Sequence, residues 1–253
     1  MSEGDRPLPW WREFYGSEDG IPLSFFPSEE HTDAEVEGLV ELLELRPGML
    51  VADICCGAGR HAVRLARQGM QVTGLDASEL MLGRARESAG GVEGCMLVQG
   101  DAARLPFRTG AFDAALNLFN SFGYYEDDEL NQRALDEVAR CLRPGGGFAL
   151  ETRNRTYQIL YAPYHLQVAL ADGSPAIIRC QYDRDTHRLC STWSEPGDEG
   201  AVLYRAAIRL FEVEELHEMF ERAGLVVDHV CSGYHGALFE GWERILMLIA
   251  HKP

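Results

Sequence analysis

The chain has 253 residues, a formal net charge of −17 and 46% hydrophobic residues. This length suits one large domain or one domain with a sizeable insert, and the hydrophobic fraction excludes global disorder. Because an acidic surface repels phosphate backbones, the charge disfavours nucleic acid as a partner.

The cysteines and the N-terminus predict a cytoplasmic protein. The cysteines are seven in number, and their spacing matches neither a C-x-x-C pair nor a zinc pattern, so we expect reduced thiols and no metal. The first residues are acidic and polar, unlike a secretion signal, and no apolar run approaches the ~18 residues needed to span a bilayer. No membrane association is therefore expected.

The first 31 residues show no clear periodicity of apolar side chains. Residues 1–31 are rich in proline, aromatic residues and acids, and we interpret them as an N-terminal extension or lid. Thr32 followed by Glu35 is a capping-box pattern, so a helix is predicted to begin at Thr32. The Arg-Pro-Gly sequence at 46–48 is predicted to end that helix.

Strand and helix patterns then alternate as far as residue 152. Strands are predicted at 50–54, 71–75, 95–99, 112–118 and 148–151, and helices at 61–68, 78–86 and 127–141. This alternation is typical of an α/β fold in which helices cover both faces of a parallel sheet.

The pattern changes after residue 152. Runs of period 2 at 177–182, 189–193 and 204–211 are separated by turn sequences, which predicts a small antiparallel sheet inserted into the main fold. A helix at 214–223 and strands at 225–230 and 245–250 complete the chain. The predicted organisation is an extension over 1–31, a core over 32–152, an insert over 153–211 and the rest of the core over 212–253.

Polar residues follow four predicted strands at the point where each strand ends. The first strand runs into a Gly-rich turn, D-I-C-C-G-A-G at 53–59, where a ligand can approach the backbone. The second ends at Asp76, where an acid is placed to accept ribose hydroxyls. Gly-Asp-Ala at 100–102 and Asn-Leu-Phe-Asn at 117–120 follow the next two strands. Since ligands bind at this edge of open α/β sheets, the four features together predict an adenosine-type cofactor.

These motifs resemble those of the class I S-adenosylmethionine-dependent methyltransferases over residues 33–152 and again from 211 to the C-terminus. The dinucleotide fingerprint is not met, because Ala62 stands where its third glycine would fall, and no P-loop motif is present. Cys55 departs from the glycine usual in the family. The resemblance implies a Rossmann-like, doubly wound, seven-stranded sheet, mostly parallel, with the last strand at 245–250 antiparallel.

The resemblance also implies S-adenosyl-L-methionine as cofactor and S-adenosyl-L-homocysteine as product. It assigns Asp53 to the cofactor's amino group, Asp76 to the ribose and Asp101 to the adenine. Helix capping is the alternative role for Asp76 and Asp101, and core packing is the alternative for Met81. The residues that the resemblance places at the cofactor are Asp53, Cys55, Gly57, Gly59, Asp76, Ala77, Met81, Asp101, Ala102, Asn117 and Leu118.

Residues for the methyl acceptor are less well defined by the sequence. Candidates for a catalytic base are His235, His165 and Tyr124, with a structural or solvated role as the alternative for the histidines. Arg153 and Arg155 follow the fifth strand and are candidates for binding a carboxylate, unless they form salt bridges. The predicted substrate-side residues are Tyr15, Phe119, Phe122, Tyr124, Arg153 and Tyr234.

The predicted function is methyl transfer to an O or N atom of a small molecule. The chain has no N-P-P-[YFW] motif after the fourth strand, no Pro-Cys pair and no acidic cluster suited to a divalent metal. Alternatives are a methyltransferase that acts on a peptide, a protein or RNA, a cofactor-binding protein without turnover, and a nicotinamide-dependent dehydrogenase. The insert is predicted either to roof the acceptor site or to form a homodimer surface.

Overall fold

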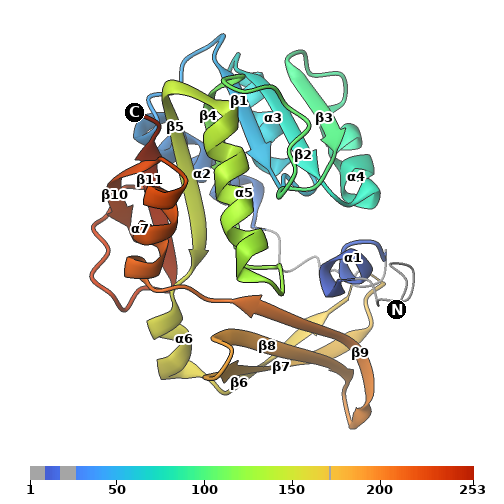
Figure 1. Ribbon diagram of the computed structural model, residues 1–253. Helices are drawn as coiled ribbons and strands as arrows, with labels where there is room; N and C mark the ends of the chain where they lie inside the picture. The colour runs from blue at the N-terminus through green and yellow to red at the C-terminus, as the bar shows by residue number, and fades with distance from the viewer. Residues whose placement is uncertain (1–8, 18–26, 171) are drawn as a thin grey trace, which may run out of the picture.

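The computed structural model describes residues 9–17, 27–170 and 172–253, and a seven-stranded sheet forms its centre (Figure 1). The strands lie in the order β10-β11-β5-β4-β1-β2-β3. Pairing is parallel from β3 across to β5, whereas β11 is antiparallel to both of its neighbours. The predicted fold class is confirmed, including the antiparallel last strand. The strand bounds are β1 Leu50–Ile54, β2 Gln71–Asp76, β3 Cys95–Gln99, β4 Phe112–Asn117, β5 Leu142–Arg153, β10 Val226–Cys231 and β11 Ile245–His251.

Helices cover both faces of this sheet and bury separate apolar clusters against it. On one face α2 (Glu29–Leu42), α3 (Arg60–Arg67) and α4 (Glu79–Ala89) pack side by side. On the other face lie α5 (Asp128–Cys141) and α7 (Val213–Arg222) (Figure 1). Because both faces are buried, the central strands read as continuous apolar runs rather than as alternating patterns.

Helix α2 begins one turn earlier than the sequence pattern predicts. Its N-cap is Ser28, whose hydroxyl oxygen accepts from the backbone N–H of His31 at 3.2 Å. Thr32 lies inside the helix, and Glu35 turns into the interior instead of closing a capping box. The predicted start at Thr32 is therefore wrong for two reasons. Ser28 caps the helix one turn upstream, and Glu35 forms a buried ion pair with Arg60 instead of a hydrogen bond to the N-terminus of the helix.

The second sheet has four antiparallel strands in the order β6-β7-β8-β9, and it lies beyond the carboxyl ends of the parallel strands (Figure 1). Its strands are β6 Tyr164–Ala169, β7 Pro175–Asp183, β8 Arg188–Glu195 and β9 Asp198–Arg209. The inserted antiparallel sheet is confirmed. Three elements were not predicted: β6, the short helix α6 (Arg155–Tyr161) and the helix α1 (Trp10–Phe14), which lies between the two sheets.

Ion pairs between two largely buried arginines and more exposed acids fasten the second sheet and α6 to the helical core. Arg209, at the end of β9, contacts Asp128 at 3.1 Å and Glu215 at 2.6 Å. Arg155 in turn contacts Glu212 at 2.6 Å and Glu215 at 2.7 Å. The backbone N–H of Arg209 also donates to the carbonyl of Gly123 at 2.8 Å. These contacts hold the second sheet directly over the loop that follows β4.

Candidate functional site

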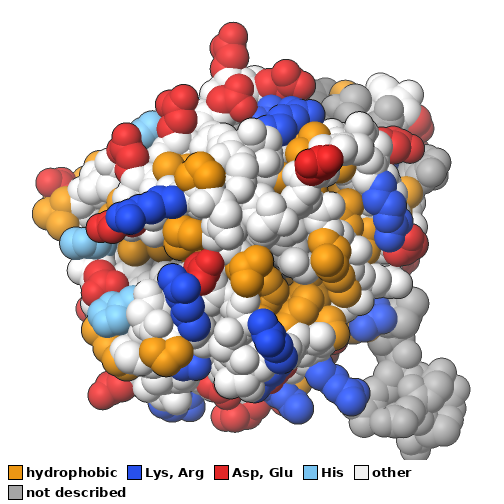
Figure 2. Space-filling view, turned by 90° about the horizontal axis from the view of Figure 1, so that it is seen from above, with side chains coloured by type: hydrophobic (Ala, Val, Ile, Leu, Met, Phe, Trp, Pro, Cys, Tyr) orange, Lys and Arg blue, Asp and Glu red, His pale blue; other side chains and the backbone are white. Residues whose placement is uncertain are grey.

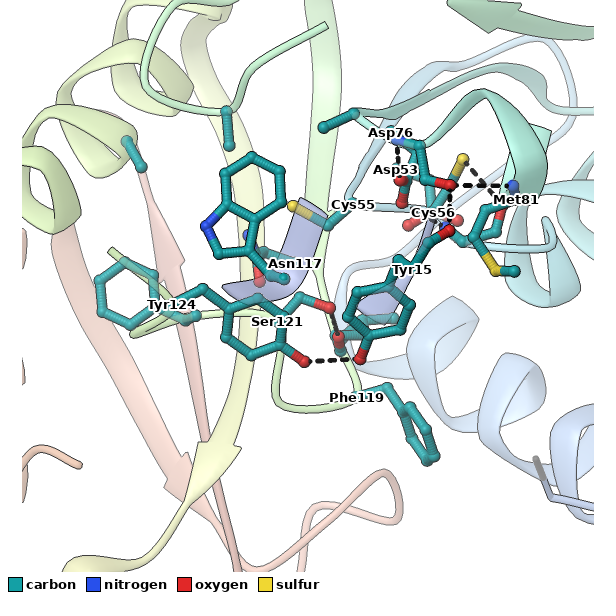
Figure 3. A pocket seen from close by; sticks show the side chains of 18 of the residues that line it. Tyr15, Asp53, Cys55, Cys56, Asp76, Met81, Asn117, Phe119, Ser121 and Tyr124 are labelled. Carbon is teal, nitrogen blue, oxygen red and sulfur yellow. Dashed lines mark hydrogen bonds between the residues drawn. The ribbon is translucent and has the colours of Figure 1, made fainter. Parts of the chain in front are cut away.

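One pocket opens at the carboxyl ends of β1, β2 and β4, between these strands and α1. Figure 3 shows the side chains that line it. Its walls come from the Gly-rich turn at 55–58, the junction of β2 and α4 at 76–78, the turn at 100–102 and the loop at 117–125. Three aromatic residues of the N-terminal segment, Trp11, Phe14 and Tyr15, close it from the side of the second sheet. The structure thus brings together the four sequence motifs and part of the N-terminal segment, including Tyr15, which was predicted on the substrate side.

All the residues predicted to bind the cofactor line this pocket, except Gly59. Gly59 caps α3 with a left-handed φ of 74°, and a Cβ there would lie 3.0 Å from the Cβ of Ala85. A glycine is required at position 59 because a larger side chain would prevent the close packing of α3 on α4. Cys55 has a φ of 61°, which explains why a glycine is favoured at that position.

Asp76 holds the Gly-rich turn in place as well as facing the pocket. Its Oδ2 accepts from the backbone N–H of Gly57 at 2.8 Å, and its Oδ1 accepts from that of Ser78 at 2.8 Å. Burial raises the pKa of Asp76, while these N–H donors favour its charged form. Each oxygen keeps a second lone pair, which is the acceptor that a pair of ribose hydroxyls requires.

Asp53 and Asn117 present unpaired oxygens to the same pocket. Both side chains are buried, and Asp53 Oδ2 and Asn117 Oδ1 have no hydrogen-bond partner in the described part of the chain. Burial raises the pKa of Asp53 to about 7, and the positive charge of Arg60 opposes that shift only in part. Since buried acceptors without partners are costly, these oxygens fit a ligand that carries an ammonium group. The residues present therefore fit the methionine end of S-adenosylmethionine.

The surroundings of Asp101, which the resemblance assigns to the adenine, include a residue that the sequence motifs missed. The hydroxyl of Tyr125 donates to Asp101 Oδ1, which also accepts from the backbone N–H of Ala103 at 3.0 Å. Asp101 Oδ2 faces Arg12 at 3.9 Å. Tyr125 lies in the loop after β4 and meets Asp101 in the turn after β3, 24 residues earlier in the chain, and no spacing rule signals that contact.

Aromatic residues of the N-terminal segment and of the loop after β4 line the rest of the pocket. The hydroxyls of Tyr15 and Tyr124 lie 2.9 Å apart and point toward each other (Figure 3). The carbonyl of Tyr15 accepts from the hydroxyl of Ser78 at 2.6 Å, which ties α1 to the cofactor side. Burial raises the pKa of Tyr15 and of Tyr124, so both phenols are protonated near neutral pH. A phenol that keeps its proton at neutral pH is poorly suited to act as a base, which argues against that predicted role for Tyr124.

The structure separates several predicted acceptor residues from the pocket. His235 and His165 are exposed and do not line it, so neither is placed as a catalytic base. In the loop after β10, Tyr234 turns inward and its neighbour His235 faces solvent. Arg153 is not a lining residue and lies next to the pocket, at the end of β5, whereas Phe119 and Phe122, in the loop after the neighbouring strand β4, do line the pocket. Loop residues have no period, so the sequence could not tell which of two neighbours points inward.

Tyr234 instead belongs to a buried network behind the pocket wall. The carboxylate of Glu151, at 2% exposure, accepts from the Tyr234 hydroxyl and from the backbone N–H of Phe119 at 2.8 Å. Phe119 and the next residue, Asn120, both have left-handed φ angles of 56° and 61°. The guanidinium of Arg60, paired with Glu35, covers the Phe119 ring at 4.7 Å. This network holds a strained turn of the pocket wall in place.

We expect Tyr234→Phe to lower the free energy of unfolding by about 1–2 kcal/mol, because the buried carboxylate of Glu151 would lose one of its two donors. Urea denaturation at pH 7 measures the change. Tyr161→Phe is the matched control, since Tyr161 is 59% exposed and should leave the free energy unchanged. Equal stability of the two variants would contradict a stabilising role for the network.

Comparison with known proteins places the chain in a family. The profile of the family described as methyltransferase domain matches residues 51–146. An uncharacterized methyltransferase of Synechocystis is 40% identical over 125 residues, which is 49% of this chain and 56% of that protein. A demethylmenaquinone methyltransferase of Staphylococcus aureus is 30% identical over 192 residues, covering 72% of this chain and 70% of that protein. The alignments thus span from about half to over two thirds of these relatives.

Structural similarity extends further than sequence similarity. The CcbJ methyltransferase of Streptomyces caelestis superposes with a TM-score of 0.77 at 22% identity, covering 94% of this chain and 98% of that one. Together with the fold and the pocket, these matches show that the chain belongs to the class I S-adenosylmethionine-dependent methyltransferases.

Across residues 9–17, 27–170 and 172–253, each helix is too short or too polar to span a bilayer.

Proposed function

We propose that the protein transfers a methyl group from S-adenosylmethionine to an O or N atom of a small molecule. The observation that carries this proposal is the continuity of the pocket, which runs from the Gly-rich turn and Asp76 to the aromatic pair Tyr15 and Tyr124. A cofactor bound by the acids at one end would direct its other end toward the aromatic side. The enclosure by α1 and the second sheet favours an acceptor of small size.

The chain's own groups would bind the cofactor, orient the acceptor and exclude water from the pocket. When bound, the cofactor supplies an activated methyl group, so the protein must mainly align a nucleophile and keep solvent out. Asp76 would hold the ribose, Asp101 the adenine amino group and Asp53 the ammonium. The protonated Tyr15 and Tyr124 hydroxyls would accept or donate hydrogen bonds at the acceptor, and the surrounding rings would exclude water.

Surface charge and thiol chemistry support the remaining parts of the proposal. On the face where the parallel strands begin, basic side chains are separated by acidic ones and form no continuous stripe, which disfavours nucleic acid there (Figure 2). All seven cysteines are free thiols, which suits a reducing compartment such as the cytoplasm. The edge strand β6 is exposed along much of its length and would suit pairing in a homodimer.

Transfer of a labelled methyl group tests the proposal. The protein is incubated with methyl-labelled S-adenosylmethionine and a cell extract that is then separated into small-molecule, protein and RNA fractions. We expect label in the small-molecule fraction, and no label with an Asp76→Ala variant. Label in protein or RNA would favour the macromolecular alternative. Binding of S-adenosylhomocysteine without any transfer would favour a cofactor-binding protein without turnover.

A further inference from the structure

Arg153 lies beside the acceptor side of the pocket and away from the ribose-binding end. It is the last residue of β5, where it pairs with Ile245 of β11. Because β4 separates β5 from β1 and β2, Arg153 lies on the far side of the pocket from Asp76. Its positive charge acts on both Tyr15 and Tyr124, opposing the rise in pKa that burial causes in each. Since β5 lies next to β4 and the loop after β4 carries Tyr124, Arg153 and the two hydroxyls lie at the same edge of the sheet.

This guanidinium has no protein partner in the described part of the chain. The Nε atom of Arg153 is buried and its N–H donates to no acceptor among the described residues, and none of the ion pairs between those residues involves this side chain. The neighbouring Arg155 differs, because Glu212 and Glu215 both bind it. Of the two arginines after the fifth strand, one is neutralised by acids and the other is left with a free positive charge.

A third tyrosine lies within the reach of the charge of Arg153. Tyr164 of β6 feels the same positive charge, together with that of the exposed Arg244. In a chain of net charge −17, an anion is repelled by most of the surface and needs local cations to bind. A planar guanidinium matches the two oxygens of a carboxylate or phosphate and binds either with two hydrogen bonds.

We infer that the methyl acceptor carries an anionic group, a carboxylate or a phosphate, and that Arg153 binds this group at the end of β5 beside Tyr15 and Tyr124. The inference rests on the proposed function, since it concerns the acceptor of the same site. It makes Arg153 a specificity-determining residue: an acceptor with the anion would be held beside the two hydroxyls, and a neutral analogue would not.

Fragment binding to the complex with S-adenosylhomocysteine tests this inference. The probes are benzoate, phenyl phosphate and the uncharged benzamide, whose common ring suits the aromatic walls. Binding is measured by ligand-observed saturation-transfer NMR on the wild type and on Arg153→Gln, Arg153→Lys and Arg108→Gln. The last is the matched control, because Arg108 is exposed and lies just before the start of β4, at the opposite end of the parallel strands from the pocket. Calorimetry with S-adenosylhomocysteine and thermal melting check that each variant is folded.

We expect the wild type to bind at least one anionic fragment five times more tightly than benzamide, and the tighter of the two names the anion. Arg153→Gln should remove this preference, Arg153→Lys should retain part of it, and Arg108→Gln should keep it, all with unchanged affinity for S-adenosylhomocysteine. Three outcomes would overturn the inference while leaving the proposed function standing. These are equal binding of benzamide and the anionic fragments, an anion preference that survives in Arg153→Gln, and no binding of any fragment. Failure of the wild type to bind S-adenosylhomocysteine overturns the proposed function, and the inference with it.

Discussion

Replacing Asp76 with alanine is expected to weaken the binding of S-adenosylhomocysteine at least tenfold, or by about 1.4 kcal/mol or more. Two contributions are lost together. The carboxylate is the proposed acceptor for both ribose hydroxyls, and it also fixes the Gly-rich turn through the N–H of Gly57 at 2.8 Å. Hydrogen bonds to a charged group each contribute about 1.5–3 kcal/mol, so a tenfold loss is the lower bound. Titration calorimetry at pH 7.5 measures the change.

Two further variants make the Asp76 result specific. Asp76→Asn keeps the size of the side chain and one acceptor oxygen, so its loss of affinity should be intermediate. Asp172→Ala removes an exposed carboxylate from a turn of the second sheet and should leave the affinity unchanged. A loss of less than threefold in Asp76→Ala, with the variant folded, would show that this acid does not hold the ribose.

The affinity for S-adenosylhomocysteine should also rise with pH, with Kd falling about tenfold between pH 6 and pH 8. Burial raises the pKa of Asp53 to about 7, so the group is largely protonated at pH 6 in the unliganded protein. The proposed partner of Asp53 is the ammonium of the ligand, which requires the carboxylate. Below pH 7 binding must therefore displace a proton, and above pH 7 it need not. Calorimetry at several pH values, in buffers of different ionisation enthalpy, measures both Kd and the proton released.

Asp53→Asn is the control that isolates this effect. It should bind S-adenosylhomocysteine more weakly than the wild type at pH 8 and should show little change with pH. The stability of the unliganded protein should change in the opposite direction. Because the folded pKa lies above the ordinary value, the contribution of Asp53 to stability is present at low pH and is lost as the pH rises toward 7. A Kd that is independent of pH in the wild type would refute the assignment of Asp53 to the ammonium.

Most of the cofactor side could be predicted from sequence because its signals are local. Each parallel strand is an apolar run that ends at a fixed point, and the carboxyl ends of such strands meet at one edge of the sheet. Asp53, Asp76 and Asp101 each follow directly from this rule, and all three line the pocket. The helix start at Thr32 was misplaced for the converse reason: a local motif was present, but a buried ion pair with Arg60 required Glu35 inside the core.

What the sequence by itself determined was the order of strands and helices, the Gly-rich turn and the acids at the strand ends, because periodicity and motifs are properties of neighbouring residues. Only the tertiary structure decided which distant residues meet. It placed Tyr15 against Tyr124 and Tyr234 against Glu151, and it turned His235 to solvent. Among the described residues it also left Arg153 Nε without an acceptor, while Arg155 pairs with two acids. These outcomes depend on the paths of loops and on the docking of the second sheet, which are set by packing and electrostatic contacts between segments that no local pattern records.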